Sequence, residues 1–312
     1  MKEKVLYKAQ TRKMFHAHIK IKVPLHCHDT LFDDLFSIIE KTDTQYNSYS
    51  PGSFIDRINK NAGLFVETDE TTVRLLERAK EFSEIFGGKY DITAMPLIRL
   101  WGFYDKAKKT HIPSEKELSE TIKKVDYRKI ETEGSRVRIA KDQEIITGSF
   151  IKAFAVDKAI DKLKQEGVAD AVINAGGSTI MAINDDRHTH WNINVTKPAT
   201  SDDELMKLKI SNRCFSTSAQ GNTFVEIGGK RYSHILNPLT GYPCDNLQTG
   251  VITGDCFSGD IISTGLFCTS PDNFDATMRK LSEQEDTEAF LIDKNNKIRY
   301  SKNLEQYIDK SL

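Results

Sequence analysis

Residues 148–183, GSFIKAFAVDKAIDKLKQEGVADAVINAGGSTIMAI, contain both kinds of regular structure that we expect in this chain. In the first half, apolar residues recur at the spacing of one helix face, at Ala153, Val156, Ile160 and Leu163. Gly167 then marks a typical helix end. Two apolar runs flank Gly176-Gly177, which predicts a strand, a glycine turn and a second strand. The pattern predicts a mixed α and β class with an antiparallel-rich sheet and inserted helices.

Periodic patterns on both sides of this stretch predict further helices and strands of the same mixed class. Strands are predicted at 16–23, where apolar and lysine residues alternate, at 191–196 and at 207–217. Helices are predicted over about 29–42 and after an N-cap at Thr68 or Asp69, with Gly87-Gly88 as the stop. Asn295-Asn296 predicts a hairpin near the C-terminus.

The charge-rich segment at 105–135 is predicted to be a peripheral helical insertion. It contains Ser114 with Glu117 three residues later, which is the pattern of a capping box that opens a polar helix.

Composition excludes several classes of function. The chain has 312 residues, and its Lys+Arg count of 44 nearly balances an Asp+Glu count of 45. This balance leaves no excess of positive charge of the kind that binds nucleic acid or an anionic membrane, so neither is an expected partner. No apolar run is long enough for a transmembrane segment.

The five cysteines and the N-terminus bear on the compartment. The cysteine number is odd, and no CxxC spacing occurs, which indicates reduced thiols. The first ten residues are charged where a signal peptide needs an apolar run. We expect a cytoplasmic protein as the sequence stands, or an exported or periplasmic one if a leader was removed.

Two loop-forming segments carry candidate ligand contacts. In Asn174-Ala175-Gly176-Gly177-Ser178, the glycines allow a close approach of phosphate to backbone N–H groups, although a plain tight turn explains the same residues. In residues 232–243, YSHILNPLTGYP, a rigid loop holds His234, which either faces a ligand or is a satisfied structural histidine.

Two helical segments carry candidate charges. Asp260 and Thr264 lie four residues apart, so a helix places their oxygens on one face, where hard ligands suit magnesium or calcium. The alternative is a helix-end aspartate and a threonine bonded to its own backbone. Lys152 follows a small-residue helix start and either reaches a phosphate or is solvated.

Taken in order, these segments resemble the FAD:protein FMN transferase (ApbE-type) family over about residues 14–267. The segments that carry the resemblance are Ser48–Ser53 with Ile58-Asn59, Gly88–Thr93 with Pro96-Leu97 and Trp101-Gly102-Phe103, Lys152 with Ala155-Val156-Asp157, the NAGGS turn, Thr217-Ser218, the HILNPLTGYP loop and the DIISTGLF helix. Their order and spacing make the match specific.

The resemblance implies an α+β fold, ApbE-like and related to the T-fold, in a single domain over 1–312. It implies transfer of FMN from FAD to a Thr or Ser hydroxyl of a partner flavoprotein, with Mg²⁺ as cofactor and release of AMP. The implied FAD contacts are Met14, Tyr49, Trp101, Gly102, Phe103, Lys152, Gly176, Gly177 and Ile235. The implied metal ligands are Asp260, Thr264 and a main-chain oxygen near Ser149, and His234 and Lys152 are the expected catalytic residues.

The sequence also departs from the family pattern. The family's aspartate before the Lys152 helix falls on Ile146, and the NAGGD motif here ends in Ser178. The helix-start glycines fall on Ser149 and Ala153, the TSGDY motif reads TSAQG at 217–221, and the early Met-Gly-Thr reads Met14-Phe15-His16. The lost carboxylate at Ile146 favours two alternatives: a non-catalytic FAD-binding paralogue, or slow turnover. An FAD pyrophosphatase that uses water is a third.

Overall fold

The computed structural model describes residues 5–104, 110–198, 203–221 and 223–310. Its helices are α1 (Thr30–Tyr46), α2 (Phe54–Lys60), α3 (Glu70–Ile85), α4 (Met95–Trp101), α5 (Glu115–Ile122), α6 (Ile151–Gln165), α7 (Cys256–Phe267) and α8 (Phe274–Ser282). Short 3-10 helices cover Tyr127–Lys129, Pro271–Asn273 and Leu304–Tyr307.

The strands in the described residues follow the same chain order. They are β1 (Tyr7–Met14), β2 (Ala17–Pro24), β3 (Val66–Glu67), β4 (Glu131–Glu133), β5 (Arg136–Arg138), β6 (Ala171–Ala175), β7 (Thr179–Ile183), β8 (Trp191–Thr196), β9 (Glu204–Ile210), β10 (Arg213–Ala219), β11 (Phe224–Ile227), β12 (Lys230–Ser233), β13 (Gln248–Thr253), β14 (Glu288–Ile292) and β15 (Ile298–Tyr300).

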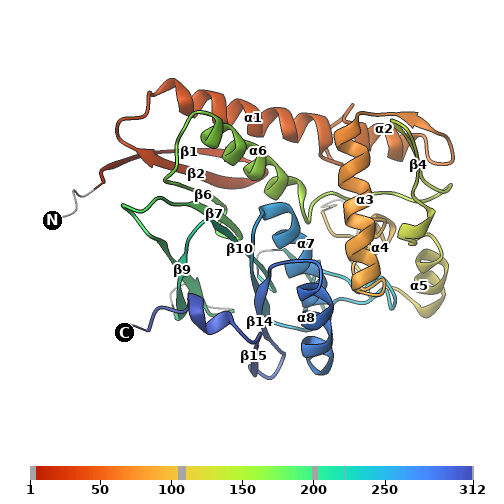
Figure 1. Ribbon diagram of the computed structural model, residues 1–312. Helices are drawn as coiled ribbons and strands as arrows, with labels where there is room; N and C mark the ends of the chain where they lie inside the picture. The colour runs from red at the N-terminus through yellow and green to blue at the C-terminus, as the bar shows by residue number, and fades with distance from the viewer. Residues whose placement is uncertain (1–4, 105–109, 199–202, 222, 311–312) are drawn as a thin grey trace.

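One eight-stranded sheet organises the molecule, in the order β1-β2-β6-β7-β10-β13-β14-β15. Every neighbouring pair in it is antiparallel. Helices α1 and α6 lie along one face of the sheet, as Figure 1 shows, and share an apolar core with β2, β6 and β7. The β8–β9 hairpin packs on the opposite face. The fold is therefore α+β with an antiparallel sheet and inserted helices, as the sequence predicted.

The central strands are buried on both faces, because layers cover both sides of the sheet. All residues of β7 and β13 are buried, whereas β8 alternates between buried and exposed residues. These central strands lie directly beneath α7, so polar side chains on β7 and β10 are held next to that helix.

Most predicted elements are confirmed. The helix after Lys152 is α6, its following strands are β6 and β7, and the strand at 16–23 is β2. Asp69 is the N-cap of α3 and accepts a hydrogen bond from the backbone N–H of Thr72. The capping box at Ser114 and Glu117 is formed at the start of α5. Asn296 has the positive φ of a hairpin turn between β14 and β15.

One prediction needs correction, and one helix was not predicted. The strand predicted at 207–217 is two antiparallel strands, β9 and β10, separated by a turn in which Asn212 adopts a φ of 51°. Asparagine tolerates this left-handed conformation better than most residues. The turn was missed because apolar residues continue on both sides of it. Residues 54–60, for which no element was predicted, form helix α2 behind an N-cap at Ser53.

The predicted insertion at 105–135 lies partly outside the described residues, since 105–109 are not described. Within it, α5 packs against α4 and buries Leu118. None of the helices formed by the described residues combines the length and the apolar character that a membrane span requires.

Candidate active site

A cavity of about 860 Å³ lies over the central strands, between the first turn of α6, one face of α7 and the loop that follows β12. Many of the predicted site residues line it: Ser149, Lys152, Gly176, Gly177, His234, Ile235, Asp260 and Thr264. The fold thus brings together residues that are more than 100 positions apart in the chain. A volume of this order suits a nucleotide-sized ligand.

Asp260 lies at the centre of a hydroxyl network. The hydroxyl of Thr179 donates to both carboxylate oxygens, at 2.8 and 2.9 Å, and the hydroxyl of Ser216 donates to Oδ1 at 2.7 Å. Burial raises the pKa of Asp260, while Lys152 and the hydroxyl donors act in the opposite direction. The network fixes the carboxylate on the cavity wall.

Lys152 extends from the first turn of α6 into the same network. Its Nζ lies 3.7 Å from Oδ2 of Asp260 and donates to Ser178 Oγ at 3.0 Å, to the hydroxyl of Thr179, and to the carbonyl of Ala175 at 3.3 Å. Both charged side chains keep a small exposed fraction, 16% for Lys152 and 13% for Asp260. The ammonium group is therefore held at the cavity surface, where an anionic ligand can reach it.

Oxygen atoms predominate around the acidic end of the cavity. The Thr264 hydroxyl donates to the carbonyl of Asp260 at 2.9 Å, so its lone pairs remain available. Ser218 Oγ lies 2.9 Å from Ser263 Oγ and 3.5 Å from Thr264 Oγ1. Together with the Asp260 carboxylate, these hydroxyls form a hard donor set that suits Mg²⁺ rather than a soft metal. Within the described residues, no group of three or more His, Cys, Asp or Glu side chains forms a metal cluster.

Ser149 lies beside this donor set but is engaged through its side chain. Its Oγ is 3.0 Å from the hydroxyl of Tyr90, a buried residue that also lines the cavity. The Ser149 side chain is thus held by a neighbour, and both Gly148 and Ser149 line the cavity.

His234 has a defined tautomer. Its Nδ1 lies 3.0 Å from the carbonyl oxygen of Thr223, and a carbonyl can only accept, so Nδ1 carries the hydrogen. Nε2 then has a free lone pair. Burial lowers the pKa of His234, which keeps the ring neutral near pH 7. The geometry and the pKa direction both suit a proton acceptor.

The NAGGS turn lines the cavity, but its glycine N–H groups are already used. The Gly177 N–H donates to Asn174 Oδ1 at 2.8 Å, and the Gly176 N–H donates to the carbonyl of His18 at 3.0 Å. The expectation that these two groups are free for phosphate is therefore not met. Gly176 instead serves close packing, because a Cβ on it would lie 2.8 Å from that of Ala17.

The predicted aromatic contacts do not line the cavity directly. Trp101 is fully buried, and its Nε1 donates to the carbonyl of Gly241 at 2.8 Å. Gly102 ends α4 at a φ of 78°, and Phe103 is buried beside the Trp101 ring. Tyr49 is half exposed, and its ring lies 5.9 Å from that of Tyr104, which does line the cavity.

Met14 lies at the tip of the β1–β2 hairpin. It packs on the core rather than on the cavity.

Several site residues were missed from the sequence. Thr179 and Ser216, which donate to Asp260, and Tyr104, which lines the cavity, have no motif signal of their own, although Thr179 directly follows the NAGGS turn. Charged lining residues were also missed, namely Lys89, Lys197 and Arg231. Together with Lys152 they place four cations around a cavity that has two carboxylates, Asp91 and Asp260. The surplus of positive charge favours a polyanionic ligand.

Ile146 also lines the cavity. The position where the family pattern has aspartate is therefore on the cavity wall, where Ile146 is partly buried and packs against the cluster around Trp101.

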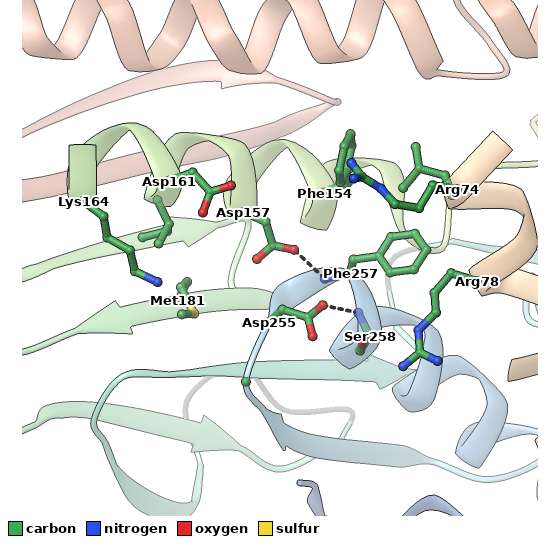
Figure 2. A pocket seen from close by; sticks show the side chains of 13 residues that line it. Arg74, Arg78, Phe154, Asp157, Asp161, Lys164, Met181, Asp255, Phe257 and Ser258 are labelled. Carbon is green, nitrogen blue, oxygen red and sulfur yellow. Dashed lines mark hydrogen bonds between the residues drawn. The ribbon is translucent and has the colours of Figure 1, made fainter. Parts of the chain in front are cut away.

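A second, smaller cavity of about 440 Å³ lies at the start of α7, as Figure 2 shows. There Asp157 accepts from the backbone N–H groups of Cys256 and Phe257 at 2.8 and 2.9 Å, and Asp255 accepts from that of Ser258 at 2.8 Å. Protein carboxylates thus already cap this helix end. None of the predicted site residues lines this cavity.

The larger cavity and its charges define an enzyme-like site for a phosphate-bearing nucleotide on an antiparallel α+β scaffold. The model of the ApbE family matches residues 15–291, and the chain belongs to that family.

Individual relatives agree with this assignment. The chain is 27% identical over 290 residues to an FAD:protein FMN transferase of Klebsiella pneumoniae, and the aligned region covers 89% of this chain and 87% of the relative. It is 25% identical over 245 residues to one of Vibrio cholerae, covering 76% and 72% respectively. A crystal structure of an ApbE protein from Thermotoga maritima superposes with a TM-score of 0.89 at 22% identity, over 98% of this chain and all of that one.

Proposed function

We propose that this protein is an FAD:protein FMN transferase. It moves the FMN half of FAD onto a Thr or Ser hydroxyl of an acceptor flavoprotein, and AMP leaves. The observation that carries the proposal is the meeting of Lys152, Asp260 and His234 around one nucleotide-sized cavity in a chain of the ApbE family. Family membership supports the reaction type, and the cavity supports the roles of individual residues.

The reaction exchanges one phosphorus–oxygen bond for another. The acceptor hydroxyl oxygen attacks the phosphorus of the FMN half, and the bridging bond to AMP breaks. Lys152, with Lys89 and Arg231 on the same cavity, stabilises the charge on the phosphate oxygens. His234 Nε2 accepts the proton of the attacking hydroxyl, since Nδ1 is held by Thr223.

Mg²⁺ is the proposed cofactor. The Asp260 carboxylate, the Thr264 hydroxyl and a main-chain oxygen near Ser149 would hold it. When bound, the cation supplies charge neutralisation at the pyrophosphate oxygens. The hard donor set supports this choice of metal.

The other proposed FAD contacts are Ile235 and the 176–177 turn on the cavity wall, with Tyr49 at its rim beside Tyr104. For Trp101, Gly102 and Phe103 we propose an indirect role, because they hold the loop that carries His234. Met14 is not among the residues that line the cavity, so we do not retain it as a contact.

One specific observation favours a second candidate function. Ile146 and Ser178 replace two carboxylates of the family pattern and both line the cavity, which favours an FAD-binding paralogue with little turnover. An FAD pyrophosphatase, with water as the acceptor, is the third candidate.

Incubation of the protein with FAD and Mg²⁺, with and without an acceptor domain, separates the three. A transferase releases AMP only with the acceptor, and a pyrophosphatase releases it in both cases. A binding paralogue retains FAD and releases no AMP.

A further inference from the structure

Two cysteines lie together at the edge of the FAD cavity. Cys268 is the C-cap of α7 and lines the cavity, and Cys244 follows the loop that carries His234. Cys244 packs against the small apolar cluster of Ile235, Phe267 and Cys268. The proposed catalytic chemistry uses neither thiol.

Backbone contacts hold the two residues side by side. The Cys244 N–H donates to the carbonyl of Ile235 at 2.9 Å, and the Cys268 thiol donates to the next carbonyl, that of Leu236, at 3.5 Å. The neighbouring Cys244 thiol, followed by burial, raises the pKa of Cys268 well above its usual value. Cys244 therefore packs beside Cys268 on a rigid segment, which is the arrangement that a disulfide requires.

Access distinguishes this pair from the other neighbouring pair of cysteines. Cys244 is partly exposed, and Cys268 borders the cavity. Cys214 and Cys256 are also neighbours, but both are fully buried. Only the first pair can meet a reagent that enters from solvent or through the cavity.

We propose that Cys244 and Cys268 form a dithiol modification site that reacts with low-molecular-weight disulfides. The more exposed thiol, Cys244, attacks one sulfur of the small disulfide, and one small thiol leaves. Cys268 then displaces the second small thiol from Cys244. The protein loses two hydrogens and two electrons as its disulfide forms, and the reagent is reduced to two thiols.

The new bond links two parts of the FAD site. It ties the loop of His234 and Ile235 to the end of α7, the helix of Asp260 and Thr264. A disulfide brings its two sulfurs to about 2.05 Å, so the loop shifts against the helix and FAD binds more weakly. By linkage, bound FAD disfavours the disulfide at equilibrium. This second effect rests on the FAD binding proposed above, whereas the disulfide itself does not.

The test equilibrates the reduced protein with a fixed mixture of oxidised and reduced glutathione, with and without saturating FAD, followed by alkylation and peptide mapping. We expect a Cys244–Cys268 linkage, with Cys27, Cys214 and Cys256 still reduced, and a ratio of linked to reduced protein at least about fivefold lower with FAD. Reduction should restore FAD affinity. The Cys244→Ser variant should keep its FAD affinity under oxidation, whereas the matched Cys27→Ser variant should remain sensitive.

Recovery of Cys244 and Cys268 as alkylated thiols, or their linkage to other cysteines, would overturn the dithiol site. An equal extent of linkage at equilibrium with FAD demonstrably bound would overturn its coupling to the cavity. A protein that forms the linkage but binds no FAD would refute the proposed function and leave the dithiol site standing.

Discussion

The Asp260 carboxylate is held in place by hydroxyl groups from two strands and by one ammonium group. Hydroxyls from β7 and β10 donate to it, and the Lys152 ammonium lies 3.7 Å away. The shared face of Asp260 and Thr264 could be predicted, because helical periodicity places residues four apart on one side. The donors Thr179 and Ser216 could not be predicted, because local sequence patterns do not show that β7 and β10 are neighbours in the sheet.

Asp260→Asn should abolish most of the Mg²⁺-dependent activity while the protein stays folded. The amide keeps the size but removes the charge that faces the cation and Lys152, so we expect a loss of about 10²–10³-fold in AMP release. Asp245→Asn, which removes an exposed carboxylate paired with Lys294, is the matched control. AMP release at the parental rate from Asp260→Asn would refute the metal assignment.

Ile146→Asp should accelerate turnover, because it restores a carboxylate on the cavity wall at a position where the side chain is not part of the deep core. We expect a gain of roughly ten- to thousandfold in AMP release at unchanged protein concentration. Ile146→Asn controls for polarity without charge. A normally folded Ile146→Asp variant with no gain would indicate that Ser149 or Ala153 is the limiting departure.

At the scale of elements, helix α4 and the 237–243 loop are joined by one hydrogen bond from Trp101 to Gly241. The Trp-Gly-Phe segment was identified from the sequence, but its burial was not. A large aromatic side chain suits both a ligand-binding surface and a hydrophobic core, so the residue type alone does not distinguish them. Ring contacts to Tyr232 and Tyr242 complete the packing.

Trp101→Phe should therefore lower stability and affect FAD only through the loop. Loss of a buried hydrogen bond and of ring volume should reduce the free energy of unfolding by about 1–3 kcal/mol, measured by urea titration. Tyr49→Ala, at the exposed rim, should instead weaken FAD binding with a smaller change in stability. The reverse pattern in the two variants would return Tyr49 to the core and Trp101 to the ligand.

The start of α7 should make stability depend on pH. Burial, followed by the charge of Asp255, raises the pKa of Asp157 to about 7 from 3.8. The folded pKa is the higher one, so the folded state holds this proton more tightly than the unfolded state. The stabilisation is therefore full below about pH 4 and is lost as pH rises through about 7.

Asp157→Asn should remove this dependence (Figure 2). Between pH 5 and pH 8, the parent should lose on the order of 2–4 kcal/mol of unfolding free energy relative to the variant. The substitution also replaces one of the two Asp157 oxygens that accept from the backbone N–H groups of Cys256 and Phe257, but that loss is independent of pH. Parallel pH profiles for parent and variant would show that Asp157 is ionised in the folded protein throughout.

At the scale of the whole molecule, the sheet explains why distant segments form one site. The chain was predicted to be α+β from its helix and hairpin patterns, and the strand order that brings α6, β7, β10 and α7 together was not predictable from local periodicity. The net charge of the chain is -1, yet four cationic side chains line the cavity. The composition therefore could not show the local surplus of positive charge at the site. The cellular compartment stays a prediction.

The most direct test of the central claim is mass spectrometry of an acceptor flavoprotein domain after incubation with the protein, FAD and Mg²⁺. We predict that one Thr or Ser of the acceptor gains the mass of FMN through a phosphoester bond, with one AMP released for each modified acceptor. An unmodified acceptor, whether FAD remains intact or is split into free FMN and AMP, would contradict assignment as a transferase.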